Sequence, residues 1–169
     1  NGNDPRQIGG AIAPDALTGA APIPINLSTS ATVRARVFNS TTNTWSALAE
    51  AEFLVGPIAS ASNLVISKIH YNPSGSSDLE EFIEVMNIGP DKLDLTNCQF
   101  TLGIQFQFPD GYTLESGARA LIVRDQAAFL NAYGNGLAGQ IAGIFANGSS
   151  LDNGGERLQL VDALNQPIK

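Results

Sequence analysis

The residues with the clearest capacity for chemistry are acidic, and four of them lie close together: Asp78, Glu80, Glu81 and Glu84. Carboxylate oxygens on a loop are ligands that calcium prefers in proteins. Side chains three residues apart in an extended strand point to opposite faces, so Glu81 and Glu84 would not converge on one ion. We therefore interpret the group as a solvated loop and strand rim and predict no bound metal. A calcium site at these four carboxylates is the alternative.

The chain offers little for nucleophilic or acid–base catalysis. A catalytic triad needs a histidine beside a nucleophile and an acid, and His70 is the only histidine. No Gly-x-Ser-x-Gly elbow occurs. Two carboxylates can hydrolyse a glycoside when one has a raised pKa, but no pattern places such a pair in a cleft. We predict that the chain has no catalytic residues and is not an enzyme, and that His70 is an ordinary strand residue.

Two further groups have both a chemical and a structural interpretation. Cys98 is the single cysteine. It could be a reactive thiol, but we expect a buried small residue. Four aromatic residues could stack on sugars, although aromatic side chains in this number usually belong to a core or its rim: Trp45, Tyr71, Tyr112 and Tyr133. The sequence therefore does not identify residues that bind a ligand.

Composition narrows the class of partner. Acidic side chains outnumber basic ones, 16 to 9, and the basic ones are scattered. A phosphate-binding surface needs clustered Lys and Arg, so we expect no nucleic acid partner. No apolar run reaches the length of a membrane-spanning helix, so we expect no membrane insertion. Frequent Gly and sparse charge between short apolar runs are typical of an all-β protein.

The pattern of residues 1–55 indicates one small β unit. Residues 31–38 alternate strictly, with Ala31, Val33, Ala35 and Val37 on one face. The other predicted strands of this unit are residues 23–27, 45–46 and 51–55, with a hairpin loop at 39–43. Residues 56–63 are small and polar around a proline, and we interpret them as a linker.

A second domain occupies residues 64–169. Its predicted strands are 64–71, 81–87, 93–102, 104–108, 118–123, 141–145 and 157–161, with a flexible loop at 72–78. One short helix is expected at 125–133, with Asp125 as N-cap and Gly134 as its end. Strand alternation places these residues in the core: Ile66, Ile83, Val85, Leu95, Phe106, Phe108, Leu121, Val123, Leu158 and Leu160.

The order of several segments in this domain carries a resemblance. They are residues 65–73, 81–87, 93–97, 106–111 and 152–158. In this order they resemble a bacterial lamin tail domain, over about residues 62–169. The resemblance implies an immunoglobulin-like β-sandwich that serves as an interaction module. The chain departs from the family pattern at Cys98, where a Trp is usual, and at Lys68, where Glu is common.

The first unit carries a second resemblance. Residues 4–6, 24–27, 33–37 and 45–46 resemble the second part of a chitobiase/β-hexosaminidase C-terminal-like β-sandwich, over about residues 1–55. The strands that this family places before Asp-Pro are missing here, so we interpret the unit as incomplete. An incomplete sandwich exposes an apolar face and strand edges. We therefore expect residues 1–55 to pack against the second domain or to pair with another copy of the chain.

Together the two resemblances imply an all-β chain: an immunoglobulin-like β-sandwich with one short helix, plus a smaller incomplete β unit. The function that they imply is a non-catalytic interaction or scaffolding region of a larger exported or surface-attached bacterial protein. The partner would be a protein or a neighbouring domain, or a surface glycan, and the location extracellular or at the cell surface. No cofactor is expected. The alternative is a carbohydrate-binding accessory module of a secreted hydrolase.

Overall fold

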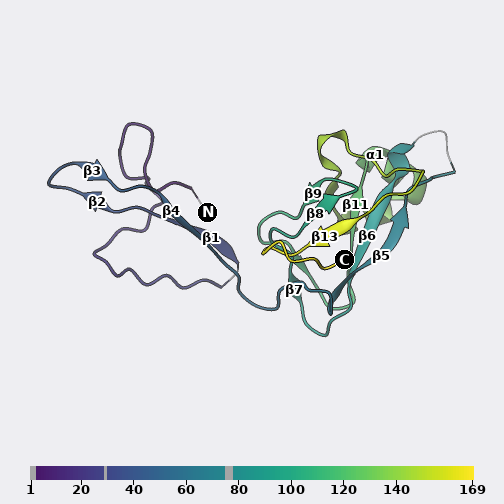
Figure 1. Cartoon of the computed structure of the whole chain (residues 1–169), viewed down its shortest axis with the longest axis horizontal. Helices are drawn as coiled ribbons and strands as arrows, with labels where there is room; N and C mark the ends of the chain where they lie inside the picture. The colour runs from purple at the N-terminus through teal and green to yellow at the C-terminus, as the bar shows by residue number, and fades with distance from the viewer. Residues whose placement is uncertain (1–2, 29, 75–77) are drawn as a thin grey trace. The chain divides into compact units, whose positions relative to one another are not determined.

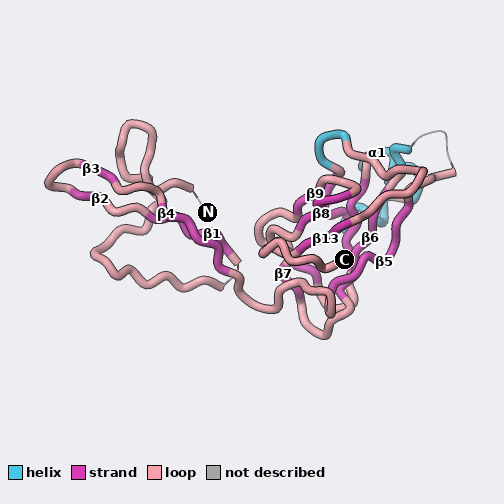
Figure 2. The backbone as a smooth tube through the Cα atoms, in the orientation of Figure 1, coloured by secondary structure: helices cyan, strands magenta, loops and turns pink. Residues whose placement is uncertain are grey.

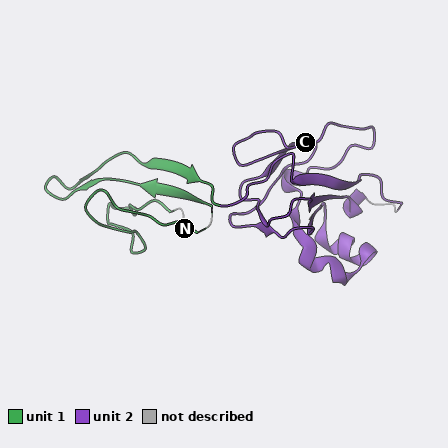
Figure 3. Cartoon of the chain, turned by 90° about the horizontal axis from the view of Figure 1, so that it is seen from below, with its two compact units in different colours: residues 1–55 green, residues 56–169 purple. Residues whose placement is uncertain are grey.

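The chain forms two compact units, Asn1–Val55 and Gly56–Lys169 (Figure 3). A computed structural model describes residues 3–28, 30–74 and 78–169. The predicted loop at 72–78 falls partly on residues 75–77, which lie outside the described residues. The predicted fold class is confirmed: strands dominate, and the described residues contain one short α-helix (Figures 1 and 2). None of the described helices is long and apolar enough to cross a membrane.

Unit 1 is built on one long antiparallel hairpin. Its strands are β1 (Ala31–Ala35), β2 (Phe38–Asn39), β3 (Thr44–Trp45) and β4 (Ala49–Phe53), with β1 paired to β4 and β2 to β3. The strand predicted at residues 23–27 is wrong, because this segment forms no strand in the structure. Pro24 explains the difference, since proline cannot donate a ladder hydrogen bond.

Unit 2 is a sandwich of two sheets. One sheet has the order β12 (Ile141–Ile144), β11 (Arg119–Val123), β6 (Phe82–Asn87) and β5 (Leu64–His70). The other has the order β13 (Gln159–Val161), β8 (Gln99–Leu102) and β9 (Phe106–Gln107), and β7 (Leu93–Asp94) pairs separately with β10 (Thr113–Leu114). All pairs are antiparallel except β11 with β12, which are parallel.

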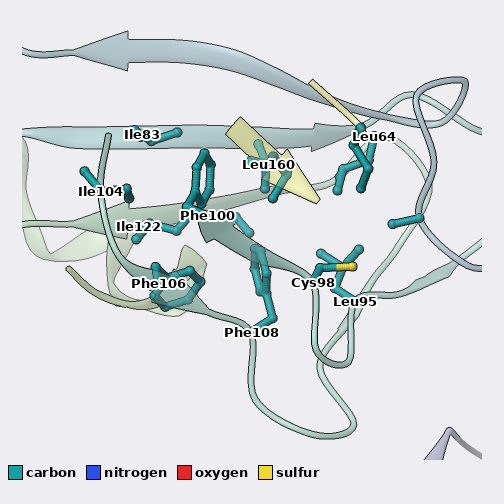
Figure 4. Packing of buried hydrophobic residues seen from close by; sticks show 14 of the residues in the cluster. Leu64, Ile83, Leu95, Cys98, Phe100, Ile104, Phe106, Phe108, Ile122 and Leu160 are labelled. Atoms are coloured by element: carbon teal, nitrogen blue, oxygen red, sulfur yellow. The ribbon is translucent and has the colours of Figure 1, made fainter. Parts of the chain in front are cut away.

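The main core lies between the two sheets of unit 2. Ile83 and Val85 from β6 pack in one cluster with Phe100 from β8, Phe106 from β9 and Leu160 from β13 (Figure 4). Eight of the ten predicted core residues are buried: Ile83, Val85, Leu95, Phe106, Phe108, Leu121, Val123 and Leu160. The other two, Ile66 and Leu158, are only half-buried at the rim of the cluster.

The outer face of the first sheet carries the helix. The helix α1 (Gln126–Tyr133) begins after Asp125, whose Oδ1 accepts a hydrogen bond from Ala128 N at 2.8 Å, and ends at Gly134 with φ +98°. Both predicted ends are confirmed. Phe129 from α1 packs with residues of β6 and β11 in a second cluster. The described part of the unit also has three short 3-10 helices: η1 (Asp78–Glu80), η2 (Asn135–Gln140) and η3 (Ala146–Gly148).

The thiol of Cys98 is buried in the main core, as expected (Figure 4). A thiol reagent must reach the sulfur atom, and the apolar side chains packed around Cys98 block that access. We therefore predict that Cys98 reacts slowly with an aromatic disulfide reagent in the native protein. In denaturant the same thiol should react at the rate of an exposed cysteine. Labelling that is equally fast in both states would overturn the buried position.

Candidate functional site

The acidic residues singled out in the sequence separate onto different surfaces. Glu81 precedes β6 on the core side, where its Oε2 accepts a hydrogen bond from Leu151 N at 2.9 Å and Arg124 Nη1 lies 3.2 Å from its Oε1. Glu84 belongs to the opposite face, paired with Arg119 Nε at 3.3 Å. The interpretation as a solvated rim is wrong for Glu81, which is fully buried.

The two remaining carboxylates do not complete a ligand set. Asp78 Oδ2 lies 3.7 Å from Arg124 Nη1, and Glu80 is half-buried at the end of η1. Over residues 3–28, 30–74 and 78–169, no three His, Cys, Asp or Glu side chains are grouped so that they could hold a metal ion. The structure therefore distributes Asp78, Glu80, Glu81 and Glu84 among different local contacts instead of one shared site.

Glu81 is a structural group. Burial raises the pKa of its carboxyl, against the smaller opposing effects of the Leu151 N–H and the Arg124 guanidinium. The carboxylate joins three segments that are far apart in the sequence: the start of β6, the residue after β11 and the loop at Leu151. Its function is to hold these segments together.

The raised pKa of Glu81 predicts how stability depends on pH. Between the ordinary value of 4.5 and the higher folded value, the native state keeps a proton that the unfolded state has released. The free energy of unfolding therefore falls as pH rises through this window. Glu81→Gln cannot titrate, so the stability of the wild type relative to this variant should rise when pH is lowered through the window. Denaturant titrations at several pH values would measure this, and parallel curves would contradict it.

A pocket of 430 Å³ lies on the outer face of the first sheet, beside α1. We call it the helix-face pocket. Strands β5, β6 and β11 contribute its base, and α1 and η2 contribute its side. Its lining residues are Lys68, His70, Phe82, Glu84, Arg119, Leu121, Phe129, Tyr133, Leu137 and Gln140.

Aromatic rings preform the pocket. The ring of Phe82 is 5.2 Å from that of Phe129 and 5.5 Å from that of Tyr133, both edge-to-face. Tyr133 Oη and His70 Nε2 are joined by a hydrogen bond of 2.9 Å. Burial, and then the negative charge of Glu80, raises the pKa of the Tyr133 phenol, which keeps it protonated. The partner of His70 Nε2 is thus a tyrosine hydroxyl rather than the serine or cysteine of a triad.

The rim of the pocket is charged. Lys68 Nζ lies 5.9 Å from the centre of the Phe82 ring, and Arg119 is held by Glu84. With two cations and one carboxylate, these three side chains carry a net positive charge on a chain whose net charge is −7. An apolar floor with a cationic rim suits an apolar side chain that has a carboxylate beside it.

The structure brings together only some of the residues that the sequence marked. His70, Glu84 and Tyr133 meet at the pocket with Lys68. Arg119 was missed, because its role depends on β11 lying beside β6. Alternation offered a signal for part of the site, since Lys68 and His70 share one face of β5.

The other marked aromatic residues do not contribute to the pocket. Tyr112 is half-buried against Phe108, with ring centres 5.2 Å apart. Trp45 belongs to unit 1, where its Nε1 donates to Gly10 O at 2.8 Å. Tyr71 is exposed after the end of β5. The four residues that could stack on sugars therefore have four different environments.

Comparison with known proteins identifies one family. The family model described as Lamin Tail Domain matches residues 57–169, which is unit 2 from its second residue to its end. No curated protein matches the chain.

Proposed function

The chain belongs to the lamin tail domain family, and we propose that it is a non-catalytic interaction region of a larger exported or surface-attached bacterial protein. The family is an immunoglobulin-like, non-catalytic domain. The helix-face pocket carries the proposal, because it offers shape and charge for recognition. A neighbouring protein or domain is the partner that this surface fits.

The dimensions and chemistry of the pocket define what it would accept. Its volume of 430 Å³ lies within the range of pockets that bind small molecules, so it is large enough for one side chain of a partner protein. The apolar floor, which includes Phe82 and Leu121, would cover an aliphatic or aromatic side chain. Lys68 would attract an acidic group beside that side chain. The partner is thus a protein segment that has an apolar residue next to Asp or Glu.

Photo-crosslinking tests this proposal. A photo-reactive phenylalanine analogue at Tyr133 would be exposed to the surface fraction of the organism that encodes the chain. A matched analogue at Leu164, on an exposed turn of the same unit, is the control. We expect a discrete protein adduct from position 133 that position 164 does not give. The same adducts at both positions would overturn the proposal. Glycan-array binding that Tyr133→Ala abolishes would support the carbohydrate-binding alternative instead.

We also propose that unit 1 is the C-terminal part of a chitobiase-like module. The proposal rests on the sequence segments that resemble this family, which include Asp4 and Arg36. These two residues form a bidentate ion pair, with Nη2 2.7 Å from Oδ2 and Nε 2.8 Å from Oδ1. The Arg36 hydrogen bond is the main cause that lowers the pKa of Asp4 to about 2. This pair ties the start of the chain to the hairpin.

Unit 1 has little core, which predicts self-association. Among its described residues only Ala13 and Ser30 are buried, and Phe53 is 48% exposed. Exposed apolar surface of this kind favours contact with a second copy of the chain. We expect light scattering to show a dimer at high concentration that Phe53→Glu dissociates and the control Ile8→Glu does not. A wild-type monomer at all concentrations would contradict this.

A further inference from the structure

One side of the sandwich is open along β5. In the described chain this strand is the edge of its sheet and pairs with β6 alone. An edge strand presents unpaired N–H and C=O groups along its outer side. The side chains beside this edge show whether it is shielded or available.

Ile69 occupies a core position that is left uncovered. The pairing of β5 with β6 shifts between Ile66 and Lys68, which marks a bulge, and Ile69 then lies opposite Ile83. Residues opposite each other in an antiparallel pair share a face, and Ile83 is fully buried in the core. Ile69 faces the same way but is 47% exposed, and Tyr71 beyond it is 48% exposed. The opposing sheet does not cover the end of this strand.

These residues line a groove of 400 Å³, which we call the edge groove. Its apolar wall is formed by Ile66, Ile69, Tyr71, Leu151 and Leu158. Its charged residues are Asp152, Glu156 and Lys169, which gives the groove a net negative charge. The groove therefore combines an unpaired strand edge, an apolar wall and acidic side chains.

We propose that the edge groove binds an extended segment of a partner protein, which adds to β5 as a new strand. Strand addition supplies main-chain hydrogen bonds, and the pockets for alternate side chains supply specificity. Every second residue of the added strand would face the groove. Apolar side chains among these residues would cover Ile69 and Tyr71, and a basic side chain among them would face Asp152 and Glu156. This site does not depend on the helix-face pocket, because it lies on the other face of β5.

A second copy of this chain fits the edge poorly. Two copies joined along β5 would place two grooves of net negative charge side by side, and like charges on paired edges oppose association. The bulge at Ser67 also interrupts the regular spacing that a second identical edge would need. A shorter segment with its own alternation can pair with the part of β5 that follows the bulge. The partner is thus a basic, apolar strand from another protein.

Titration of the 169-residue chain with the capped peptide Thr-Val-Thr-Val-Thr-Lys-Thr, called the Val–Lys peptide, tests the proposal, because its two Val and one Lys side chains point to the same face. The comparison peptide, called the Val–Glu peptide, has Glu in place of Lys. Amide spectra and hydrogen exchange would be followed for residues 65–70. We expect the Val–Lys peptide to shift these amides and slow their exchange, and the Val–Glu peptide to bind at least about tenfold more weakly. Unchanged β5 amides, or equal binding of both peptides, would overturn the proposal.

Matched variants locate the binding. Ile69→Lys should weaken the Val–Lys peptide at least about tenfold. The control Ile144→Lys changes a residue that is 54% exposed on β12, at the other edge of the same sheet, and should leave binding unchanged. Glu156 is exposed, so Glu156→Gln should remove one charge without disturbing the fold. This variant should weaken binding of the Val–Lys peptide. Equal effects of the Ile69 and Ile144 changes, or no effect of Glu156→Gln, would contradict binding in the edge groove.

Discussion

Replacing Phe108 with alanine is expected to lower the free energy of unfolding of unit 2 by about 3–5 kcal/mol. The ring is fully buried between the sheets. It stands edge-to-face to Phe106 at 4.9 Å and is tilted against Tyr112 at 5.2 Å. Truncation would remove these contacts and leave a cavity that rigid strands on both sides cannot close.

Denaturant unfolding of the Phe108→Ala variant measures this effect. Tyr71→Ala is the control, because it removes an aromatic ring of similar size from an exposed position of the same unit. The control should change the free energy of unfolding by less than about 1 kcal/mol. Similar losses in the two variants would show that Phe108 is not a core residue of the sandwich.

Replacing Glu81 with alanine is expected to lower the free energy of unfolding by about 3 kcal/mol, at the lower end for breaking a buried ion pair. The variant would leave Leu151 N without its acceptor and would remove the carboxylate beside Arg124. We use the lower end of the range because the Arg124 side chain is 25% exposed, so water can solvate its charge once the carboxylate is gone.

Glu84→Ala is the matched control, since it removes the same type of side chain from β6, on the face opposite to that of Glu81. The Glu84 side chain is 14% exposed and its partner Arg119 is 52% exposed, so this pair is more open to solvent than the pair of Glu81 with Arg124. Pairs that solvent reaches contribute about 0–1 kcal/mol. Thermal or denaturant unfolding of both variants would give the comparison. Equal losses from the two changes would contradict the different environments that the structure gives these carboxylates.

Much of the fold could be predicted from the sequence because local rules act consistently in unit 2. Alternation placed Ile83 and Val85 in the core, and it did the same for Phe106 and Phe108. A capping side chain before the helix and a glycine after it fixed both ends of α1.

Other features depended on contacts that no local pattern encodes. Glu81 and Glu84 look alike in the sequence, but Glu81 is buried because it meets the backbone of Leu151, 70 residues away. Strict alternation from Ile66 would have placed Lys68 on the core face. The bulge at Ser67 turns Lys68 toward the helix-face pocket and Ile69 toward the core.

We propose that the chain recognises a partner protein through the helix-face pocket. The most direct test of this claim is the affinity of the protein that crosslinks at position 133, measured for the wild type, Lys68→Glu and Lys92→Glu. Lys92 undergoes the same charge reversal but pairs with Glu115 away from the pocket-lining residues. We predict that Lys68→Glu weakens binding about tenfold, or about 1.4 kcal/mol, and that Lys92→Glu leaves it within about twofold. Equal affinity of all three proteins, or equal losses in both variants, would contradict the claim.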